Sequence, residues 1–287
     1  MAHSRWASPL DAIFLMGETP ETLMHVASLL HLTLPAGEER TYLRDLLADL
    51  RAGPIEAPWN LRLQTRRLMR QPVHRWVEDE AFDIDYHVRH SALPSPGGER
   101  ELGILVSRLH SNPLDFRRPP WEMHVIEGLR GGRFAIYAKI HHSLVDGYTG
   151  MRILQRGLSP DPGDRGHPFF FGLTKPPRPP RDADPVGDVT SVVRGMAESL
   201  GAMPSVARTV VDTQLGRGRT STKAVTSYQA PPSILNQRVG RARRFATQEY
   251  DLERLRGIAR AQGATLNDVL MAICAGGLRR FLSDLEA

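Results

Sequence analysis

Hydrophobic and polar side chains alternate along residues 133–142. Every second position on one face is apolar, which is the pattern of a strand with one buried face. That face carries Phe134, Ile136, Ala138 and Ile140, and His142 is the next position in the series. The other face carries Tyr137, Lys139 and His141. If the strand stays regular to its end, the alternation predicts that His142 lies at the edge of an apolar cavity and that His141 points toward a more polar layer.

A second strand is predicted directly before this one, over residues 123–129. Gly131 and Gly132 separate the two strands, and a glycine pair between strand-like segments is typical of a tight hairpin turn. An earlier strand-like run, residues 25–34, ends at Pro35. The two histidines therefore stand at the open end of a predicted hairpin.

Apolar residues recur at helical spacing in five further segments. These segments are residues 41–50, 98–112, 148–158, 251–261 and 265–285. Ser8 before Pro9 marks another helix start, and residues 244–250 predict a strand. If residues 60–70 are helical, Arg62, Arg66 and Arg70 form a basic stripe, which is either a solvated face or a contact for phosphates.

Prolines interrupt any regular structure between residues 159 and 185, which indicates a linker. Phe169, Phe170 and Phe171 within it are too apolar for a free tether, so we expect them to pack on the protein body or to contact lipid. The predicted organisation is an N-terminal domain over residues 1–158, a linker with a helical segment and a loop over 159–238, and the beginning of a C-terminal domain over 239–287. The mixture of strands and helices favours the α/β class with a mixed sheet.

The composition is that of a globular protein, with 287 residues of which 41% are hydrophobic and 24% are charged. A formal net charge of +5 favours anionic partners such as phosphates or acidic lipid headgroups. The basic segment 216–223 lacks the spacing of a phosphate-binding loop, so a mobile loop is expected there rather than a nucleic-acid site. The single Cys274 predicts a buried apolar side chain and a reducing compartment. Because no run approaches the ~18 apolar residues that span a bilayer, we expect a cytoplasmic protein, with peripheral membrane attachment as the alternative.

The candidate chemistry lies in residues 141–147. A histidine at the edge of an apolar cavity stays neutral near physiological pH and can take a proton from an alcohol, thiol or amine, so His142 is the candidate general base. Asp146 is expected to hold the turn, to bind a nearby arginine or to cap the helix that begins at Gly147. Metal binding by His141, His142 and Asp146 is not favoured, because neighbouring residues on a strand point to opposite faces. Ser143 lies outside any G-x-S-x-G nucleophile elbow.

The run His141-His142-Ser143-Leu144-Val145-Asp146-Gly147 fits the H-H-x-x-x-D-G signature of CoA-dependent acyltransferases. These enzymes are related to chloramphenicol acetyltransferase, the carnitine acyltransferases and the condensation domains of peptide synthetases. Three further segments, residues 8–11, 113–122 and 265–270, narrow the resemblance. Together, the four segments resemble the bacterial wax ester synthase/diacylglycerol acyltransferase family.

The resemblance implies a chloramphenicol acetyltransferase-like fold and an O-acyltransferase that moves a long-chain acyl group from acyl-CoA to diacylglycerol or to a long-chain alcohol. His142 would deprotonate the acceptor hydroxyl, with acyl-CoA as co-substrate and with neither a bound cofactor nor a covalent enzyme intermediate. Supporting roles would fall to His141, Asp146, Gly147, Asn267 and Asp268. A substrate-binding role would fall to Pro119, Pro120 and Trp121, which match the family's proline-leucine-tryptophan motif except at Pro120. Asn267, at a helix N-terminus, would supply or position a donor for the oxyanion, and Asp268 would stabilise the first helical turn.

Members of this family have two domains of similar size, so the resemblance implies that this chain ends within the second. Expected partners are acyl-CoA, the acceptor and, at the periphery, the inner membrane or lipid inclusions; nucleic acid is not among them. Two alternatives stand beside this hypothesis. The chain could be a non-catalytic lipid-binding remnant, or it could acylate a hydroxyl or an amine of a secondary metabolite.

Overall fold

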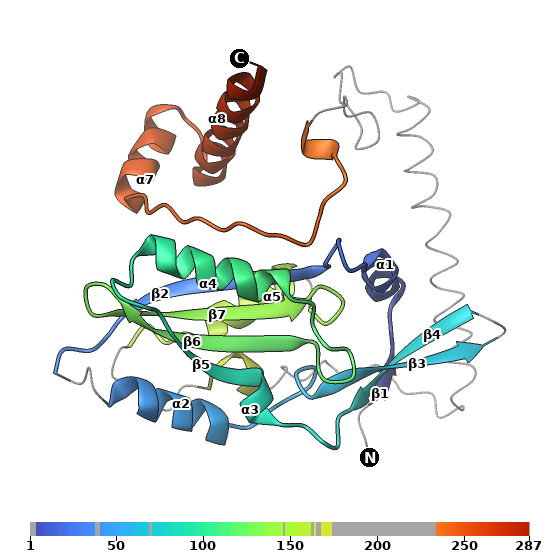
Figure 1. Cartoon of the computed structure of the whole chain (residues 1–287). Coiled ribbons are helices and arrows are strands. Elements are labelled where there is room, and N and C mark those ends of the chain that lie inside the picture. The colour runs from blue at the N-terminus through green and yellow to red at the C-terminus, as the bar shows by residue number, and fades with distance from the viewer. Residues whose placement is uncertain are drawn as a thin grey trace. The chain divides into compact units, whose positions relative to one another are not determined.

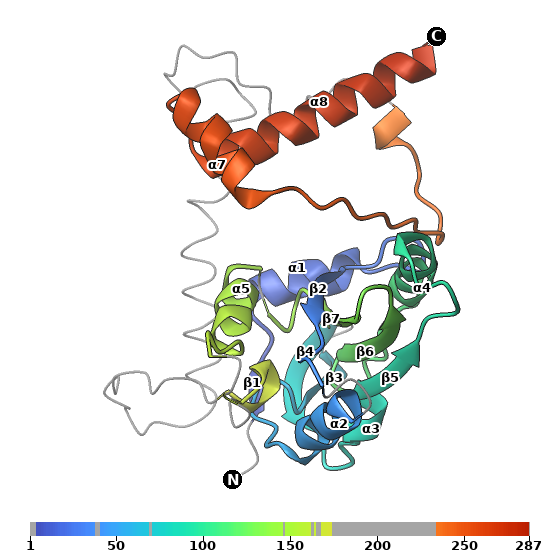
Figure 2. The ribbon, with the colours of Figure 1, turned by 90° about the vertical axis from the view of Figure 1, so that its left-hand side faces the viewer.

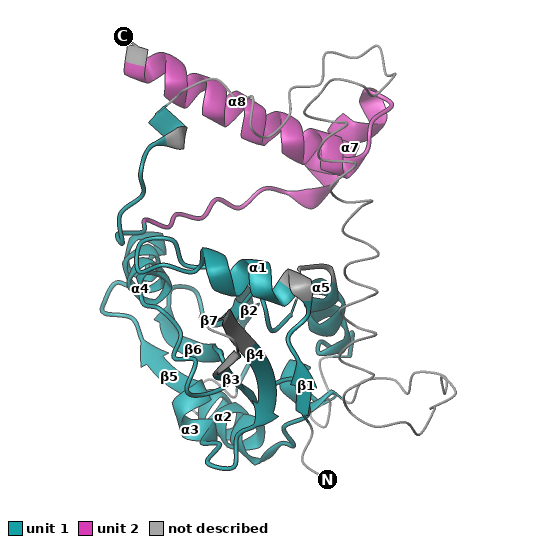
Figure 3. Ribbon diagram, turned by 90° about the vertical axis from the view of Figure 1, so that its right-hand side faces the viewer, with its two compact units in different colours: residues 1–243 teal, residues 244–287 magenta. Residues whose placement is uncertain are grey.

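The computed structural model describes residues 4–37, 41–68, 71–145, 147–161, 164, 168–173 and 234–286. The chain divides into two compact units, residues 1–243 and residues 244–287 (Figure 3). Most of the predicted linker, residues 159–238, falls outside the described residues. The predicted domain boundaries therefore stay predictions.

The first unit contains two sheets (Figure 1). The smaller sheet has the strand order β1-β4-β3 and consists of β1 (Ser4–Trp6), β4 (Gln71–Glu78) and β3 (Leu61–Leu68). The larger sheet has the order β2-β7-β6-β5 and consists of β2 (His25–Thr33), β7 (Arg133–His141), β6 (Trp121–Leu129) and β5 (Val88–Ala92). β5 and β6 are parallel, whereas β6 with β7 and β7 with β2 are antiparallel. The predicted α/β class with a mixed sheet is confirmed.

Helices cover both faces of the larger sheet. α2 (Tyr42–Ala52) lies on one face and α4 (Glu99–Ser111) on the other (Figures 1 and 2). The other helical elements in the described part of the unit are α1 (Pro9–Gly17), α3 (Ile84–His87), α5 (Gly147–Arg156) and the 3₁₀ turns Phe170–Gly172 and Ile234–Asn236. Phe134, Ile136 and Ala138 pack in the cluster with α2, whereas Tyr137 packs in the cluster with α4. The alternation along β7 therefore separates two layers, as predicted.

The loop between β6 and β7 is the predicted hairpin turn. It consists of Arg130, Gly131 and Gly132 between the paired residues Leu129 and Arg133, and the two glycines have φ angles of 75° and 64°, which glycine adopts without strain. The predicted packing of the phenylalanine run is also confirmed, because Phe170 and Phe171 are buried in the cluster on the α2 side of the sheet. This part of the chain after residue 158 therefore belongs to the protein body.

The condition for a basic stripe over residues 60–70 is not met, because Leu61–Leu68 form β3 and not a helix. Its residues pair with β4 from Leu61 opposite Glu78 to Leu68 opposite Gln71. A spacing of four residues fits the two-residue period of a strand as well as one face of a helix, so the arginine spacing could not distinguish them. The pairing with β4 shows that the segment is a strand. Arg70 lies outside the described residues.

The second unit consists of α7 (Leu252–Ala261) and α8 (Leu266–Glu286). Both helices are confirmed, as is the Asp251 cap, whose side chain accepts from the Arg254 N–H at 2.7 Å. Residues 244–250 form no strand, since the described part of this unit has no strand to pair with them. The burial expected for Cys274 is also wrong, because this side chain is exposed. Among the described helices, none is both long and apolar enough to cross a bilayer.

Candidate active site

The histidine pair lies at the end of β7. The strand stops at His141, one residue earlier than the alternation predicts, because its partner β2 begins at His25, directly opposite. The backbone N–H of His141 donates to the Pro120 carbonyl at 3.0 Å, and that of His142 donates to the Met24 carbonyl at 3.0 Å. The pair is therefore fixed between the segment that enters β6 and the segment that enters β2.

His141 is buried, with 1% of its surface exposed. Its Nδ1 accepts from the Ser143 backbone N–H at 3.1 Å and lies 2.6 Å from the Ser143 hydroxyl oxygen. A backbone N–H can only donate, so Nδ1 is unprotonated and the ring proton is on Nε2, which lies 3.5 Å from Glu18 Oε2. Burial, followed by the charge of His142, lowers the pKa of His141 to about 4. His141 is therefore neutral and turned inward, and it offers neither an accessible base nor a free metal ligand.

His142 is half-buried, and its ring stacks on Phe14 of α1 with 4.2 Å between the centroids and 10° between the planes. Its Nδ1 is buried and has no hydrogen-bond partner within the described residues. Nε2 is therefore the nitrogen that can face a reactant, and a general base must come within hydrogen-bond reach of the proton it removes. The geometry supports the assignment of His142 as the base, although that role stays a prediction.

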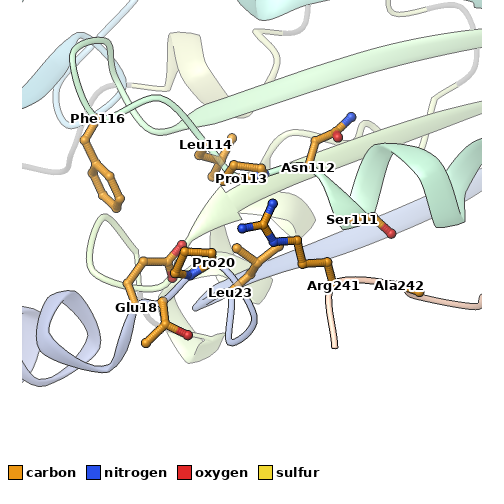
Figure 4. A pocket seen from close by; sticks show the side chains of 11 residues that line it. Glu18, Pro20, Leu23, Ser111, Asn112, Pro113, Leu114, Phe116, Arg241 and Ala242 are labelled. Atoms are coloured by element: carbon orange, nitrogen blue, oxygen red, sulfur yellow. The ribbon is translucent and has the colours of Figure 1, made fainter. Parts of the chain in front are cut away.

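A pocket of about 660 Å³ lies beside His141 (Figure 4). One part of its wall comes from the segment between α1 and β2, a second from the segment that follows α4, and a third from residues 241–242. The lining residues are Glu18, Thr19, Pro20, Leu23, Ser111, Asn112, Pro113, Leu114, Phe116, Arg241 and Ala242. Glu18 and Phe116 also contact His141, Phe116 with its ring edge-on at 4.8 Å between centroids. A largely apolar lining with a few polar groups is typical of a site for a small organic ligand.

A buried polar layer lies on the same face of β7 as His141, as predicted. Lys139 is fully buried, and its Nζ donates to Glu122 Oε1 at 2.6 Å and to the carbonyls of Leu109 at 2.8 Å and Asn112 at 3.0 Å. These carbonyls belong to the C-terminal end of α4, where a cation is favourable. Burial opposes ionisation of Glu122, but hydrogen bonding to His124 and the charge of Lys139 outweigh it and hold the pKa well below its usual range. Lys139 thus ties one wall of the pocket, at Asn112, to the sheet.

The predicted substrate-binding residues Pro119, Pro120 and Trp121 are all buried. Trp121 has no exposed surface, and its Nε1 donates to the Trp59 carbonyl at 2.7 Å. His87 Nδ1 donates to the Trp121 carbonyl at 2.7 Å, and the two rings stack. Because the Pro120 carbonyl holds the backbone of His141, this position favours a supporting role over direct substrate contact. Trp121 is packed in the core even though Pro120 stands where the family motif has leucine.

The other predicted residues are not all brought together. Asp146 lies outside the described residues, and Gly147 is the first residue of α5. Asn267 and Asp268 lie in the second unit, at the start of α8. There, Asp268 Oδ2 accepts from the Thr265 N–H at 2.8 Å and from its hydroxyl at 2.7 Å, which is the expected stabilisation of the first turn. Asn267 is exposed, and its role toward the oxyanion stays a prediction.

Sequence reasoning missed four residues of this site, namely Phe14, Glu18, Phe116 and Arg241. Phe14 and Glu18 contact the histidines from a helix far away in the sequence, so no local spacing connects them with residues 141–142. Phe116 lies in the segment 113–122 that carries the family resemblance, and this was the available signal. Arg241 extends into the pocket from the segment before the second unit (Figure 4), and nothing in its local sequence points to a ligand.

The buried histidines predict a loss of stability in mild acid. Burial is the first cause that lowers the pKa values of His25, His87 and His141, each to about 4, from an ordinary value of 6.5. Between pH 6.5 and 4 the unfolded chain therefore binds more protons than the folded chain, so the free energy of unfolding falls as the pH is lowered through this window. Urea unfolding should show a lower midpoint at pH 5 than at pH 7.5. Equal midpoints would contradict the neutral, buried state of these rings.

Comparison with known proteins agrees with the fold. Residues 7–270 match the family described as the wax ester synthase/diacylglycerol acyltransferase catalytic domain. Most of the chain lies within this match, and the match includes the histidine pair. The chain belongs to the wax ester synthase/diacylglycerol acyltransferase family.

Individual relatives support this membership. A putative diacylglycerol O-acyltransferase of Mycobacterium tuberculosis is 47% identical over 311 residues, covering 98% of this chain and 62% of the relative. The O-acyltransferase WSD of Acinetobacter baylyi is 40% identical over 280 residues, covering 96% of this chain and 58% of the relative. The solved wax ester synthase/diacylglycerol acyltransferase of Marinobacter aquaeolei VT8 has a TM-score of 0.73 at 37% identity, covering 99% of this chain and 62% of that one. The chain thus spans about three-fifths of the length of these relatives.

Proposed function

We propose that this chain carries the histidine-bearing part of an acyl-CoA-dependent O-acyltransferase that esterifies diacylglycerol or a long-chain alcohol. The observation that carries the proposal is the position of His142. It is half-buried directly after β7 and stacked on Phe14, and its buried Nδ1 leaves Nε2 as the candidate nitrogen for the base. A pocket lies beside the preceding residue, His141, whose contacts Glu18 and Phe116 line it. Membership of a family described by this catalytic domain supports the same reaction class.

The proposed reaction needs one base. His142 Nε2 takes the proton of the acceptor hydroxyl while the oxygen attacks the carbonyl carbon of the acyl-CoA thioester. The tetrahedral intermediate then expels the CoA thiolate, the C–S bond breaks, and the imidazolium returns the proton to sulfur. The products are an ester and free CoA, and His142 is neutral again. No acyl group is attached to the protein at any stage.

The oxyanion of the intermediate needs a donor. Asn267 is the residue that the resemblance assigns to this task, and it is exposed in the first turn of α8, where backbone N–H groups favour negative charge. We propose that it acts as, or positions, this donor. Acyl-CoA is the co-substrate and no resident cofactor is required by these steps.

The location of the protein follows from its substrates in this proposal. The formal net charge of +5 suits CoA phosphates and anionic lipid headgroups. We propose a cytoplasmic protein that contacts the inner membrane or lipid inclusions at their surface, where diacylglycerol and long-chain alcohols are found.

The function is tested with the purified chain, a long-chain acyl-CoA and a panel of acceptors. The panel contains diacylglycerol, a long-chain alcohol, a polar secondary alcohol and a primary amine. We expect ester formation and release of free CoA with the first two acceptors. Turnover only with the polar alcohol or the amine would move the assignment to acylation of a secondary metabolite. Acyl-CoA binding in calorimetry without turnover on any acceptor would favour a non-catalytic lipid-binding protein.

A further inference from the structure

Glu18 occupies a defined place in the first unit. It is the C-cap residue of α1, and its side chain is 15% exposed. The other end of this helix is anchored by Asp11, whose Oδ2 accepts from the Ser8 N–H at 3.1 Å, Arg5 Nη1 at 2.9 Å and Trp76 Nε1 at 3.3 Å. Trp76 is fully buried in the core, so α1 is fixed to the protein body at the end opposite to Glu18.

The Glu18 carboxylate contacts two parts of the histidine site. Its Oε2 accepts a short hydrogen bond from the Met24 backbone N–H and lies 3.5 Å from Nε2 of His141. The Met24 carbonyl in turn accepts from the backbone N–H of His142 at 3.0 Å. One carboxylate oxygen thus lies near the ring of the first histidine and is connected, through the single residue Met24, to the backbone of the second.

Each of the two Glu18 contacts, with His141 and with Met24, has a physical effect on the histidine pair. The proton of His141 is on Nε2, because Ser143 donates to Nδ1, and the buried Nε2 has no hydrogen-bond partner within the described residues. A carboxylate at 3.5 Å supplies negative charge at that position. His142 lies beyond the end of β7, where β2 no longer pairs with it. The Met24 carbonyl is therefore what fixes its backbone, and Glu18 holds Met24.

We propose that Glu18 is a positioning residue for the histidine pair, which orients the His141 ring and, through Met24, fixes the backbone from which the His142 ring projects. As a statement about catalysis this rests on the proposed acyltransferase function. Glu18 also lines the pocket, so a role limited to shaping its wall is the competing explanation. That role would not change the backbone of His142.

Three variants separate the two explanations. Glu18→Gln keeps the side-chain length and an oxygen that can accept from Met24, and it removes the charge that lies 3.5 Å from His141 Nε2. Glu18→Asp keeps the charge but is shorter by one methylene, so it breaks both contacts. Glu21→Asp makes the same change at a neighbouring carboxylate that pairs with Arg241 at 3.8 Å and touches neither histidine, and it serves as the matched control.

The first measurement is hydrogen exchange at two adjacent backbone amides, and it does not depend on activity. Glu18→Asp should speed exchange at the His142 amide by about tenfold, the size of one net hydrogen bond. The His141 amide, which donates to the Pro120 carbonyl on the other side, should keep its protection. Glu18→Gln and Glu21→Asp should leave both amides unchanged. Unchanged exchange at His142 in Glu18→Asp, or equal loss at both amides, overturns the proposal.

The second measurement is steady-state kinetics. Glu18→Asp should lower kcat by roughly 10- to 100-fold, the range associated with a small misplacement of a catalytic group, while KM for acyl-CoA stays within a factor of about two. Glu18→Gln should retain most of the activity. A raised KM with unchanged kcat would show that Glu18 only shapes the pocket and would overturn the positioning role. If the unmodified chain forms no ester while the exchange results hold, the proposed function fails and the structural contact stands.

Discussion

Substituting alanine for His142 is expected to lower the rate of ester formation by roughly 10²- to 10⁴-fold, the contribution usual for a general base. The loss should appear in kcat, because the ring takes up a proton only as the acceptor oxygen attacks. KM for acyl-CoA should change little. The ring stacks on Phe14 and is only half-buried, so its removal should leave the fold intact. The measurement is release of free CoA together with ester formation.

A matched control is His90→Ala. His90 lies on β5 of the same sheet, its side chain is 40% exposed, and it pairs with Glu127 at 3.4 Å, away from the histidine pair. This variant should keep full activity and a closely similar stability. Equal rates in His142→Ala and the unmodified chain would remove His142 as the base, and they would leave the observed ester formation without a catalytic group on β7.

The hairpin of β6 and β7 and the two layers on either side of β7 could be predicted from the sequence, because the alternation along β7 assigns its side chains to two faces. Phe134, Ile136 and Ala138 face the α2 layer, whereas Tyr137 and Lys139 face the α4 layer. A two-residue period has only two possible faces, so a single alternating run assigns every side chain on it. The glycine pair, Gly131 and Gly132, then predicted the hairpin turn between the two strands.

The end of the strand could not be predicted in the same way. β7 stops at His141 because β2 begins opposite it, and the position at which a partner strand begins is a property of a distant segment. The same reason explains the missed contacts of Phe14 and Glu18, and also why the arginine spacing over residues 60–70 did not distinguish a strand from a helix. In each case the deciding interaction joins segments far apart in the sequence. Local periodicity contains no information about such partners.

The sequence identified the motif residues, and the structure separates their roles by how deeply each side chain is buried. His141 and Trp121 are fully enclosed, and both act through hydrogen bonds to the chain around them. His142 keeps a nitrogen available. Strand alternation already favoured His142 over His141 as the base, and the distances to Ser143, Glu18 and Phe14 add which groups each ring contacts.

Lys139→Met is expected to destabilise the protein by about 3–5 kcal/mol, the usual cost of removing one partner of a buried ion pair. Methionine fills a similar volume but leaves Glu122, whose side chain is only 9% exposed, without its 2.6 Å partner. It also removes the donor to the Leu109 and Asn112 carbonyls at the end of α4. The measurement is the free energy of unfolding from urea titration at pH 7.5, where the buried histidines are neutral in both states.

The double variant Glu122→Leu with Lys139→Met is the control for this interpretation. It removes both charges together, and replacing a buried ion pair by apolar side chains is often neutral or stabilising. The double variant should therefore be more stable than Lys139→Met alone, and the difference gives the coupling energy between the two residues. A single variant that loses less than about 1 kcal/mol would mean that Glu122 finds another partner, with Arg89 at 3.3 Å as the first candidate.

The same pair of variants shows whether the buried layer serves the site as well as the fold. Lys139 holds the carbonyl of Asn112, and Asn112 lines the pocket beside His141. If the double variant regains stability but binds acyl-CoA more weakly than the unmodified chain, the ion pair is retained because it places the pocket wall. If stability and acyl-CoA binding recover together, the apolar pair holds the end of α4 equally well, and the charges contribute nothing that packing cannot supply.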